Sequence, residues 1–144
     1  MLYELNSWKE IQALAHLKSL CGTDTHWLLD IDDTLIECVS YIGSSKWFDA
    51  EIPKHKGTES LLIQRWCEMA PFLEFRLCDE SISEFIRNLG GDITAVTSRT
   101  IVSEKATRKH LNVIYDLNLL TNKKIKVKFM IIEILDTLNG VSVF

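Results

Sequence analysis

The stretch Trp27-Leu28-Leu29-Asp30-Ile31-Asp32-Asp33-Thr34-Leu35 decides the fold. It opens with three apolar residues and continues into a cluster of acids. An apolar run that ends at polar residues is typical of a buried strand in a parallel sheet. An ionised side chain at the end of such a strand is costly unless a metal ion or an ammonium group meets it there. The stretch therefore predicts a buried strand followed by an acidic turn that binds a cation.

A second apolar strand is predicted at Ile93–Val96, and it ends at the polar run Thr97-Ser98-Arg99. Between the two strands, an amphipathic helix is indicated by the spacing of Ile82, Phe85, Ile86 and Leu89. Gly90-Gly91 follows this helix as a glycine C-cap. Two strands joined by a helix indicate a parallel α/β sheet, in which ligands bind beyond the carboxyl ends of the strands. We therefore expect Asp30 and Thr97 to end neighbouring strands and to face one crevice.

The rest of the chain predicts further elements around this pair of strands. Ser7-Trp8-Lys9-Glu10 fits a capping box that opens a first helix. Helices are also predicted over 60–70 and 103–111, and a half-exposed strand over 125–131, where apolar residues alternate with lysines. Asn139-Gly140 is a hairpin-turn signal.

These elements predict an α/β core formed by residues 1–37 and 78–144, with a helical insert at residues 38–77. The length of 144 residues suits one domain with such an insert. The formal net charge of −4 predicts no general attraction to nucleic acid or to anionic lipid. The sequence has no apolar run of the roughly 18 residues that a membrane span needs, and Met1–Ser7 do not resemble a secretory signal. We expect a cytoplasmic protein without a nucleic-acid or membrane partner.

The cysteines and histidines give no separate indication of chemistry. Cys21, Cys38, Cys67 and Cys78 form no CxxC pair, and no Cys/His spacing matches a zinc site. The four histidines are scattered, without a Cys or Ser partner at a suggestive spacing. We therefore expect the cysteines to be small buried apolar residues.

The Asp-x-Asp spacing of Asp30 and Asp32 places two carboxylates within reach of one ligand. One acid can then attack as a nucleophile, while the other gives and takes a proton. The competing interpretation is an acidic turn that caps a helix. A strand that ends in a threonine means little alone, but the two motifs in this order favour the catalytic interpretation.

Together the two motifs resemble those of the haloacid dehalogenase-like superfamily, in which one apolar strand leads into Asp-x-Asp-x-Thr/Val and a later one ends in Thr or Ser. Here the two motifs are Leu28–Thr34 and Ile93–Thr97. Asp32–Leu35, Gly43–Asp49 and Thr97–Arg99 further resemble a bacterial subgroup of unknown function within this superfamily. The resemblance covers most of the chain. It implies a three-layer α/β/α, Rossmann-like fold with a mainly parallel sheet and a cap insert.

The resemblance implies a magnesium-dependent phosphohydrolase that acts on a small phosphorylated substrate. Asp30 would attack phosphorus to form an aspartyl-phosphate, and Asp32 would protonate the leaving oxygen and then activate water. Mg²⁺ would bind the Asp30 carboxylate and the backbone carbonyl of Asp32. Thr97 and Ser98 would bind the phosphoryl group, and Arg99 would add a bidentate contact, with an exposed surface arginine as the alternative. Asp32 favours phosphoryl transfer over dehalogenation, because a halide leaving group needs no general acid.

The superfamily also uses a lysine and an acidic pair, and we find no clear equivalent of either. Glu133 and Asp136 follow an apolar run, but the lysines at 123, 124, 126 and 128 lie too close upstream for the usual separating helix. These lysines fit the solvated face of an edge strand. Asn139–Phe144 resembles the hairpin before the lysine motif, so we expect a C-terminally truncated core that self-associates or is marginally stable. A non-catalytic binding or self-associating module is the alternative function.

Residues 38–77 occupy the position of the superfamily's cap, a lid that excludes water and selects the substrate. Their aromatic residues include Trp47, Phe48, Trp66 and Phe72. These side chains would either line the lid or form the small core of the insert.

Overall fold

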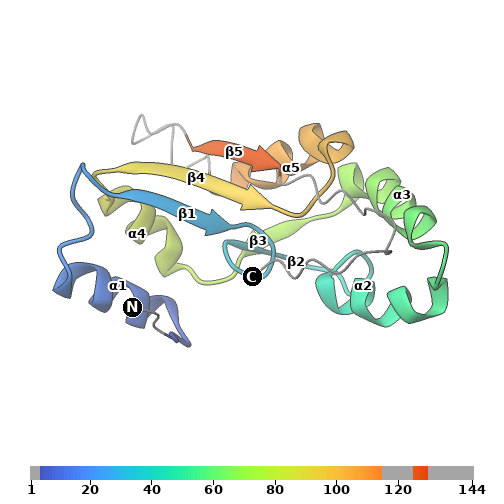
Figure 1. Ribbon diagram of the computed structural model, residues 1–144, viewed down its shortest axis with the longest axis horizontal. Helices are drawn as coiled ribbons and strands as arrows, with labels where there is room; N and C mark the ends of the chain where they lie inside the picture. The colour runs from blue at the N-terminus through green and yellow to red at the C-terminus, as the bar shows by residue number, and fades with distance from the viewer. Residues whose placement is uncertain (1–3, 115–124, 130–144) are drawn as a thin grey trace, which may run out of the picture.

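A three-stranded parallel sheet organises the computed structural model, which describes residues 4–114 and 125–129 (Figure 1). Its strands β1 (His26–Asp30), β4 (Asp92–Thr97) and β5 (Lys126–Phe129) lie in the order β1-β4-β5. Asp30 pairs with Val96, and Thr97 pairs with Phe129. The prediction of a parallel α/β sheet is confirmed, and so is the prediction that Asp30 and Thr97 end neighbouring strands.

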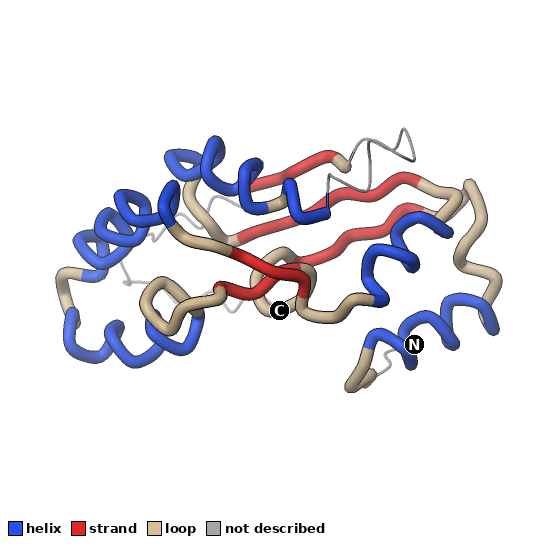
Figure 2. Tube along the Cα trace, turned by 180° about the vertical axis from the view of Figure 1, so that it is seen from behind, coloured by secondary structure: helices blue, strands red, loops and turns tan. Residues whose placement is uncertain are grey.

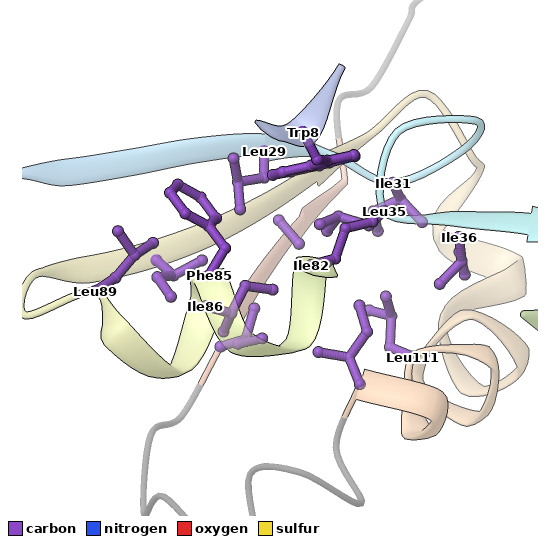
Figure 3. Close-up of a cluster of buried hydrophobic side chains, with 14 of the residues drawn as sticks. Trp8, Leu29, Ile31, Leu35, Ile36, Ile82, Phe85, Ile86, Leu89 and Leu111 are labelled. Carbon is purple, nitrogen blue, oxygen red and sulfur yellow. The ribbon is translucent and has the colours of Figure 1, made fainter. Parts of the chain in front are cut away.

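Helices cover one face of this sheet. They are α1 (Trp8–Leu17), α4 (Ser81–Asn88) and α5 (Glu104–His110), all of which lie close to their predicted positions. Figure 3 shows Ile82, Phe85 and Leu89 packed beneath Leu29, with Leu111 beside them. Because side chains alternate between the faces of a strand, Leu28 points to the opposite face, where it is 66 % exposed.

The first helix begins where the capping box predicts. The Ser7 hydroxyl accepts a hydrogen bond from the backbone N–H of Glu10 at 3.3 Å. The Glu10 carboxylate accepts from the backbone N–H of Asn6 at 2.7 Å, one residue earlier than in the usual capping box. The two bonds satisfy backbone donors on both sides of the helix start.

The glycines after α4 have a different role from the predicted C-cap. The helix ends at Asn88, and Leu89 after it has an extended backbone. The only glycines with positive φ in the described residues are Gly43 and Gly57. A Cβ at Gly91 would collide with the carbonyl oxygen of Thr25. Close approach of two backbone segments, and not a left-handed conformation, therefore requires glycine here.

The predicted insert is tied at its two ends by a short antiparallel pair. Strand β2 (Ile36–Cys38) pairs with β3 (Phe75–Leu77), so that Cys38 lies opposite Phe75. Between these strands lie α2 (Ser45–Glu51), η1 (Ile52–His55), α3 (Glu59–Met69) and η2 (Ala70–Phe72), and a further turn, η3 (Ile101–Ser103), follows β4. The strands of the main sheet point toward α2 and α3, which Figure 2 shows at the end of the molecule away from α1.

Three of the four aromatic residues singled out in the insert pack together in a small core. Trp66 is buried, and Trp47 and Phe48 pack in the same small cluster, which reaches Ala106 of α5. Phe72 is 85 % exposed and belongs to neither a lid nor a core.

Several sequence predictions lie outside the described residues. These are the hairpin at 139–144, the acids Glu133 and Asp136, and the lysines at 123 and 124. Within the described residues, none of the helices has the length and apolar character of a membrane-spanning segment.

Candidate functional site

The three acids lie at the end of β1 (Asp30) and in the tight turn that follows it (Asp32 and Asp33). The backbone N–H groups of Leu35 and Ile36 both donate to the carbonyl of Ile31 at 3.0 Å. Ile31 and Leu35 are fully buried and anchor the turn, whereas the acids between and before them reach toward solvent. The indole of Trp8 donates to the carbonyl of Thr34 at 3.2 Å, so that α1 also holds this turn.

The Asp30 carboxylate stands at the carboxyl end of β1. The Thr34 hydroxyl donates to its Oδ2 at 3.0 Å. Partial burial raises the pKa of Asp30 above its usual value, and the negative charges of Asp32 and Asp33 raise it further, against the effect of the Thr34 bond. A cation at this point would offset both the burial and the repulsion.

Asp32 is paired with Arg99 from the loop after β4. Arg99 donates from Nε to Oδ2 of Asp32 at 2.9 Å and from Nη2 to Oδ1 at 2.5 Å. Its Nη1 donates to Oγ1 of Thr107 at 3.2 Å, and the guanidinium lies 4.9 Å from the ring centre of Phe75 and 5.1 Å from that of Trp66. The two predicted motifs are therefore joined directly by a bidentate ion pair.

His110 connects this ion pair to the insert. Its Nε2 lies 2.7 Å from the carbonyl oxygen of Ala70, which can only accept, so Nε2 carries the proton and donates. Its Nδ1, at 2.9 Å, accepts from Nη1 of Arg99. Burial first, and then the charge of Arg99, lowers the pKa of His110 to about 4. A continuous chain of bonds thus runs from Ala70 through His110 and Arg99 to Asp32.

Thr97 and Ser98 differ in their exposure. Thr97 is fully buried, and its hydroxyl oxygen accepts from the backbone N–H of Arg99 at 3.0 Å. That bond leaves the hydroxyl hydrogen of Thr97 free to donate. Ser98 is exposed.

A cavity of about 560 Å³ lies between the insert and the carboxyl ends of the strands. Its apolar lining is Cys38, Phe48, Ile63, Trp66, Cys67, Phe75, Ile101 and Phe129. Its other lining residues are Asp32, Asp33, Gly43, Ser44, Ser45, Asp49, Ser98, Arg99 and Thr100. The cavity is thus an apolar chamber with the acidic turn and the loop after β4 on one side.

The structure brings three of the five predicted site residues to this cavity. Asp32, Ser98 and Arg99 line it, whereas Asp30 and Thr97 are not among its lining residues. Asp30 lies level with Val96, so the side chains of Asp30 and Thr97 leave the sheet on opposite faces, and the expectation that they face one crevice is wrong. Arg99 is only 6 % exposed, so the alternative of an exposed surface arginine is wrong. Its buried guanidinium donates hydrogen bonds to Asp32, Thr107 and His110.

Thr107 and His110 were not singled out by the sequence analysis. A signal for them exists, because Ser103, Thr107 and His110 recur at helical spacing and place hydrogen-bonding groups on the buried face of the predicted helix. Buried polar groups of this kind need partners, which here they find in Arg99 and in one another.

The fit of Mg²⁺ depends on the oxygen donors of the acidic turn. The described residues contain no group of three or more His, Cys, Asp or Glu side chains placed to hold a metal ion. Mg²⁺, however, commonly keeps several waters and takes only one or two carboxylates together with substrate phosphate. The exposed carboxylate of Asp30 and the backbone carbonyl of Asp32 would supply two such oxygens.

The fold and the site define an α/β protein with an acidic turn at the end of a parallel strand, beside a cavity that an insert lines in part. Residues 4–139 match the family described as "Protein of unknown function (DUF2608)", and the chain belongs to this family. No curated protein and no solved structure matches the chain.

Proposed function

We propose that the protein is a cytoplasmic phosphohydrolase of the haloacid dehalogenase-like type, which hydrolyses phosphate monoesters through an aspartyl-phosphate with Mg²⁺ as cofactor. In this proposal the sheet belongs to a three-layer, Rossmann-like core, and residues 38–77 form its cap. The observation that carries the proposal is that Asp30 and Thr97 end adjacent parallel strands, with Asp32 at the wall of a cavity. Four free cysteines suit a reducing compartment.

Asp30 is the nucleophile in this proposal. Thr34 donates to one carboxylate oxygen, Oδ2, and in this proposal an oxygen of this carboxylate attacks phosphorus. The new bond joins Asp30 to phosphorus, while the bond from phosphorus to the leaving oxygen breaks. In this proposal the hydroxyl of Thr97, at the end of the next strand, would donate to a phosphoryl oxygen.

Asp32 moves the protons of both half-reactions. In the first it gives a proton to the leaving oxygen, and in the second it takes one from the water that attacks the aspartyl-phosphate. That second step releases inorganic phosphate and restores Asp30. The bidentate pair with Arg99 fixes the position of the Asp32 carboxylate, which must be ionised for the second step. For the first step Asp32 must carry a proton, so one of its oxygens has to leave Arg99.

The acidic turn would hold the cofactor through the Asp30 carboxylate and the Asp32 backbone carbonyl. When bound, Mg²⁺ neutralises phosphate charge, so that an anionic nucleophile can approach an anionic ester. Asp33, on the same turn, adds negative charge beside Asp30 and favours cation binding.

The proposal is tested by assaying phosphate esters with and without Mg²⁺ for the wild type, Asp30→Asn and Asp24→Asn. Asp24 is an exposed acid upstream of β1 and serves as the matched control. We expect Mg²⁺-dependent turnover that Asp30→Asn abolishes and Asp24→Asn retains. Turnover that survives in Asp30→Asn removes Asp30 as the nucleophile.

A non-catalytic, self-associating protein is a second candidate, and one observation favours it. Leu28 is 66 % exposed in the middle of β1, where a large apolar side chain favours association. Sedimentation of the wild type and of Leu28→Lys over a range of concentrations tests this function. Association that Leu28→Lys abolishes, with no turnover of any ester, would favour this candidate over the phosphohydrolase.

A further inference from the structure

The cavity beside the acidic turn lies on the leaving-group side of the proposed reaction. In an in-line displacement the leaving oxygen lies opposite the attacking oxygen. Asp32, the proposed acid for the leaving oxygen, lines the cavity, whereas the proposed nucleophile Asp30 does not. The part of the cavity wall away from Ser98 and Arg99 therefore reports on the alcohol of the ester.

This wall is apolar and rich in aromatic rings. Phe48, Ile63, Trp66, Phe75, Ile101 and Phe129 contribute to it. The volume of about 560 Å³ falls within the range of small-molecule sites, which runs from about 300 to 1,000 Å³. Aromatic side chains recognise flat apolar ligands by burial and by ring stacking. The wall thus suits an alcohol that carries one or two aromatic rings.

The charges of the cavity disfavour an anionic leaving group. Among the described residues that line it, Arg99 is the sole cation, and its donors are already shared by Asp32, Thr107 and His110. Asp33 and Asp49 add negative charge to the lining. A second phosphate or a carboxylate would lose its hydration without finding a cation, and would meet repulsion as well.

Of the four hydroxyls that line the cavity, on Ser44, Ser45, Ser98 and Thr100, two are engaged within the protein. The Ser44 hydroxyl accepts from the backbone N–H of Trp47 and donates to the carbonyl of Tyr41, and the Thr100 hydroxyl lies 3.2 Å from Sγ of Cys67. These two lining hydroxyls are therefore engaged within the protein. A sugar would bury several hydroxyls against an apolar wall, which costs free energy for each hydrogen bond left unmade.

We propose that the substrates are phosphate monoesters of uncharged aryl or arylalkyl alcohols, and not sugar phosphates or nucleotides. This inference rests on the proposed phosphohydrolase function and deepens it by naming the leaving group.

Binding of the product alcohol tests the inference without requiring turnover. Calorimetry on the full chain compares naphthylethanol with naphthylacetate, a probe of similar size that carries a negative charge. We expect the alcohol to bind about tenfold or more tightly than the carboxylate, a difference of about 1.4 kcal/mol. Equal binding of the two probes, or tighter binding of the carboxylate, overturns the inference.

Two neighbouring exposed residues provide a matched pair of variants. Ile101 lines the cavity and is 58 % exposed, whereas Val102 is 81 % exposed and is not part of the lining. Because both side chains are largely exposed, Ile101→Asp and Val102→Asp are expected to fold. We expect Ile101→Asp to weaken alcohol binding about tenfold and Val102→Asp to leave it unchanged. Equal effects of both variants would overturn the cavity as the binding site.

Turnover separates this inference from the function on which it rests. The ratio kcat/KM is compared for naphthylethyl phosphate, a hexose phosphate and a nucleoside monophosphate. We expect the aryl ester to be preferred about tenfold or more. A preference for the hexose or nucleoside ester overturns the inference alone, whereas no turnover of any ester, including simple alkyl and aryl phosphates, overturns the proposed function.

Discussion

Arg99 donates to both carboxylate oxygens of Asp32, across a separation of 67 residues in the sequence. Only 4 % of the Arg99 side chain is exposed, against 32 % of Asp32. The loop after β4 is thereby tied to the turn after β1. Because His110 bonds both Arg99 and the carbonyl of Ala70, the position of the insert is also linked to the carboxylate of Asp32.

Removal of the guanidinium should destabilise the fold. We expect Arg99→Ala to lower the free energy of unfolding by about 3 kcal/mol, because Asp32, Thr107 and His110 all lose a partner. Urea denaturation measures this change. Arg76→Ala is the control, since the exposed pair of Arg76 with Glu37 should contribute less than about 1 kcal/mol. Similar losses in both variants would contradict a special role for the buried pair.

His110 should make stability depend on pH in the acid range. Its pKa in the folded protein is lowered from 6.5 to about 4, so the unfolded chain binds the proton more readily. Stability that is fully present above pH 6.5 is therefore lost as the pH falls toward 4, by up to about 3 kcal/mol. Protonation also gives Nδ1 a hydrogen where it accepts from Arg99.

The variant His110→Gln isolates this effect, because glutamine does not titrate. Chemical denaturation at several pH values should show a smaller loss of stability between pH 6.5 and 4 than in the wild type. His16, which is exposed on α1, provides the control variant His16→Gln. An unchanged pH dependence in His110→Gln would show that other groups carry the acid sensitivity.

Asp30 should have the opposite effect on stability. Its pKa is raised above 3.8 in the folded protein, so the ionised carboxylate disfavours folding at neutral pH. We expect Asp30→Asn to raise the midpoint of thermal unfolding at neutral pH, since asparagine can still accept from Thr34. The gain should disappear as the pH falls below 3.8, where the Asp30 carboxyl group of the wild type is also uncharged. A lower midpoint for Asp30→Asn at neutral pH would contradict this electrostatic account.

The close approach of Gly91 to Thr25 predicts a severe effect of a single methyl group. Gly91→Ala should cost more than about 2 kcal/mol, because the added Cβ meets backbone and not a flexible side chain. Gly22→Ala should be nearly neutral, since the nearest atom to its Cβ, the Ser19 oxygen, lies at 4.0 Å. Thermal unfolding of the two variants compares them, and equal midpoints would contradict the close approach.

The central part of the fold could be predicted because local patterns decide it. The apolar runs before Asp30 and Thr97 and the amphipathic helix between them indicate a parallel pair of strands. The start of α1 follows from the Ser7 cap. These features depend on residues close together in the sequence and on the rule that two strands joined by a helix lie parallel. One sequence is therefore sufficient to predict them.

The remaining features depend on contacts that one sequence does not encode locally. Strands β2 and β3 have three residues each, too few for an alternating pattern, and they pair across the whole insert. The partners of Arg99 depend on how the insert packs against α5. From the sequence, Arg99 is predicted to bind phosphate because it follows Thr97 closely. In the structure Arg99 is buried and bonds to Asp32.

The last prediction concerns Asp32 and uses the leaving group as the probe. Asp32→Asn cannot protonate a leaving oxygen, so turnover of an alkyl phosphate should fall by about 10² to 10⁴. Nitrophenol is acidic enough to leave without a proton, so the first half-reaction of nitrophenyl phosphate should survive. The second half-reaction still needs a base to activate water, and the aspartyl-phosphate on Asp30 should therefore accumulate.

Rapid mixing with nitrophenyl phosphate should then show a burst of one nitrophenolate per Asp32→Asn molecule, followed by slow turnover. The wild type should show continuous turnover without this burst. Asp92→Asn, at the opposite end of β4, is the control and should behave as the wild type. If Asp32→Asn reduces turnover of the nitrophenyl and alkyl esters equally and shows no burst, Asp32 acts only through its pair with Arg99 and transfers no proton.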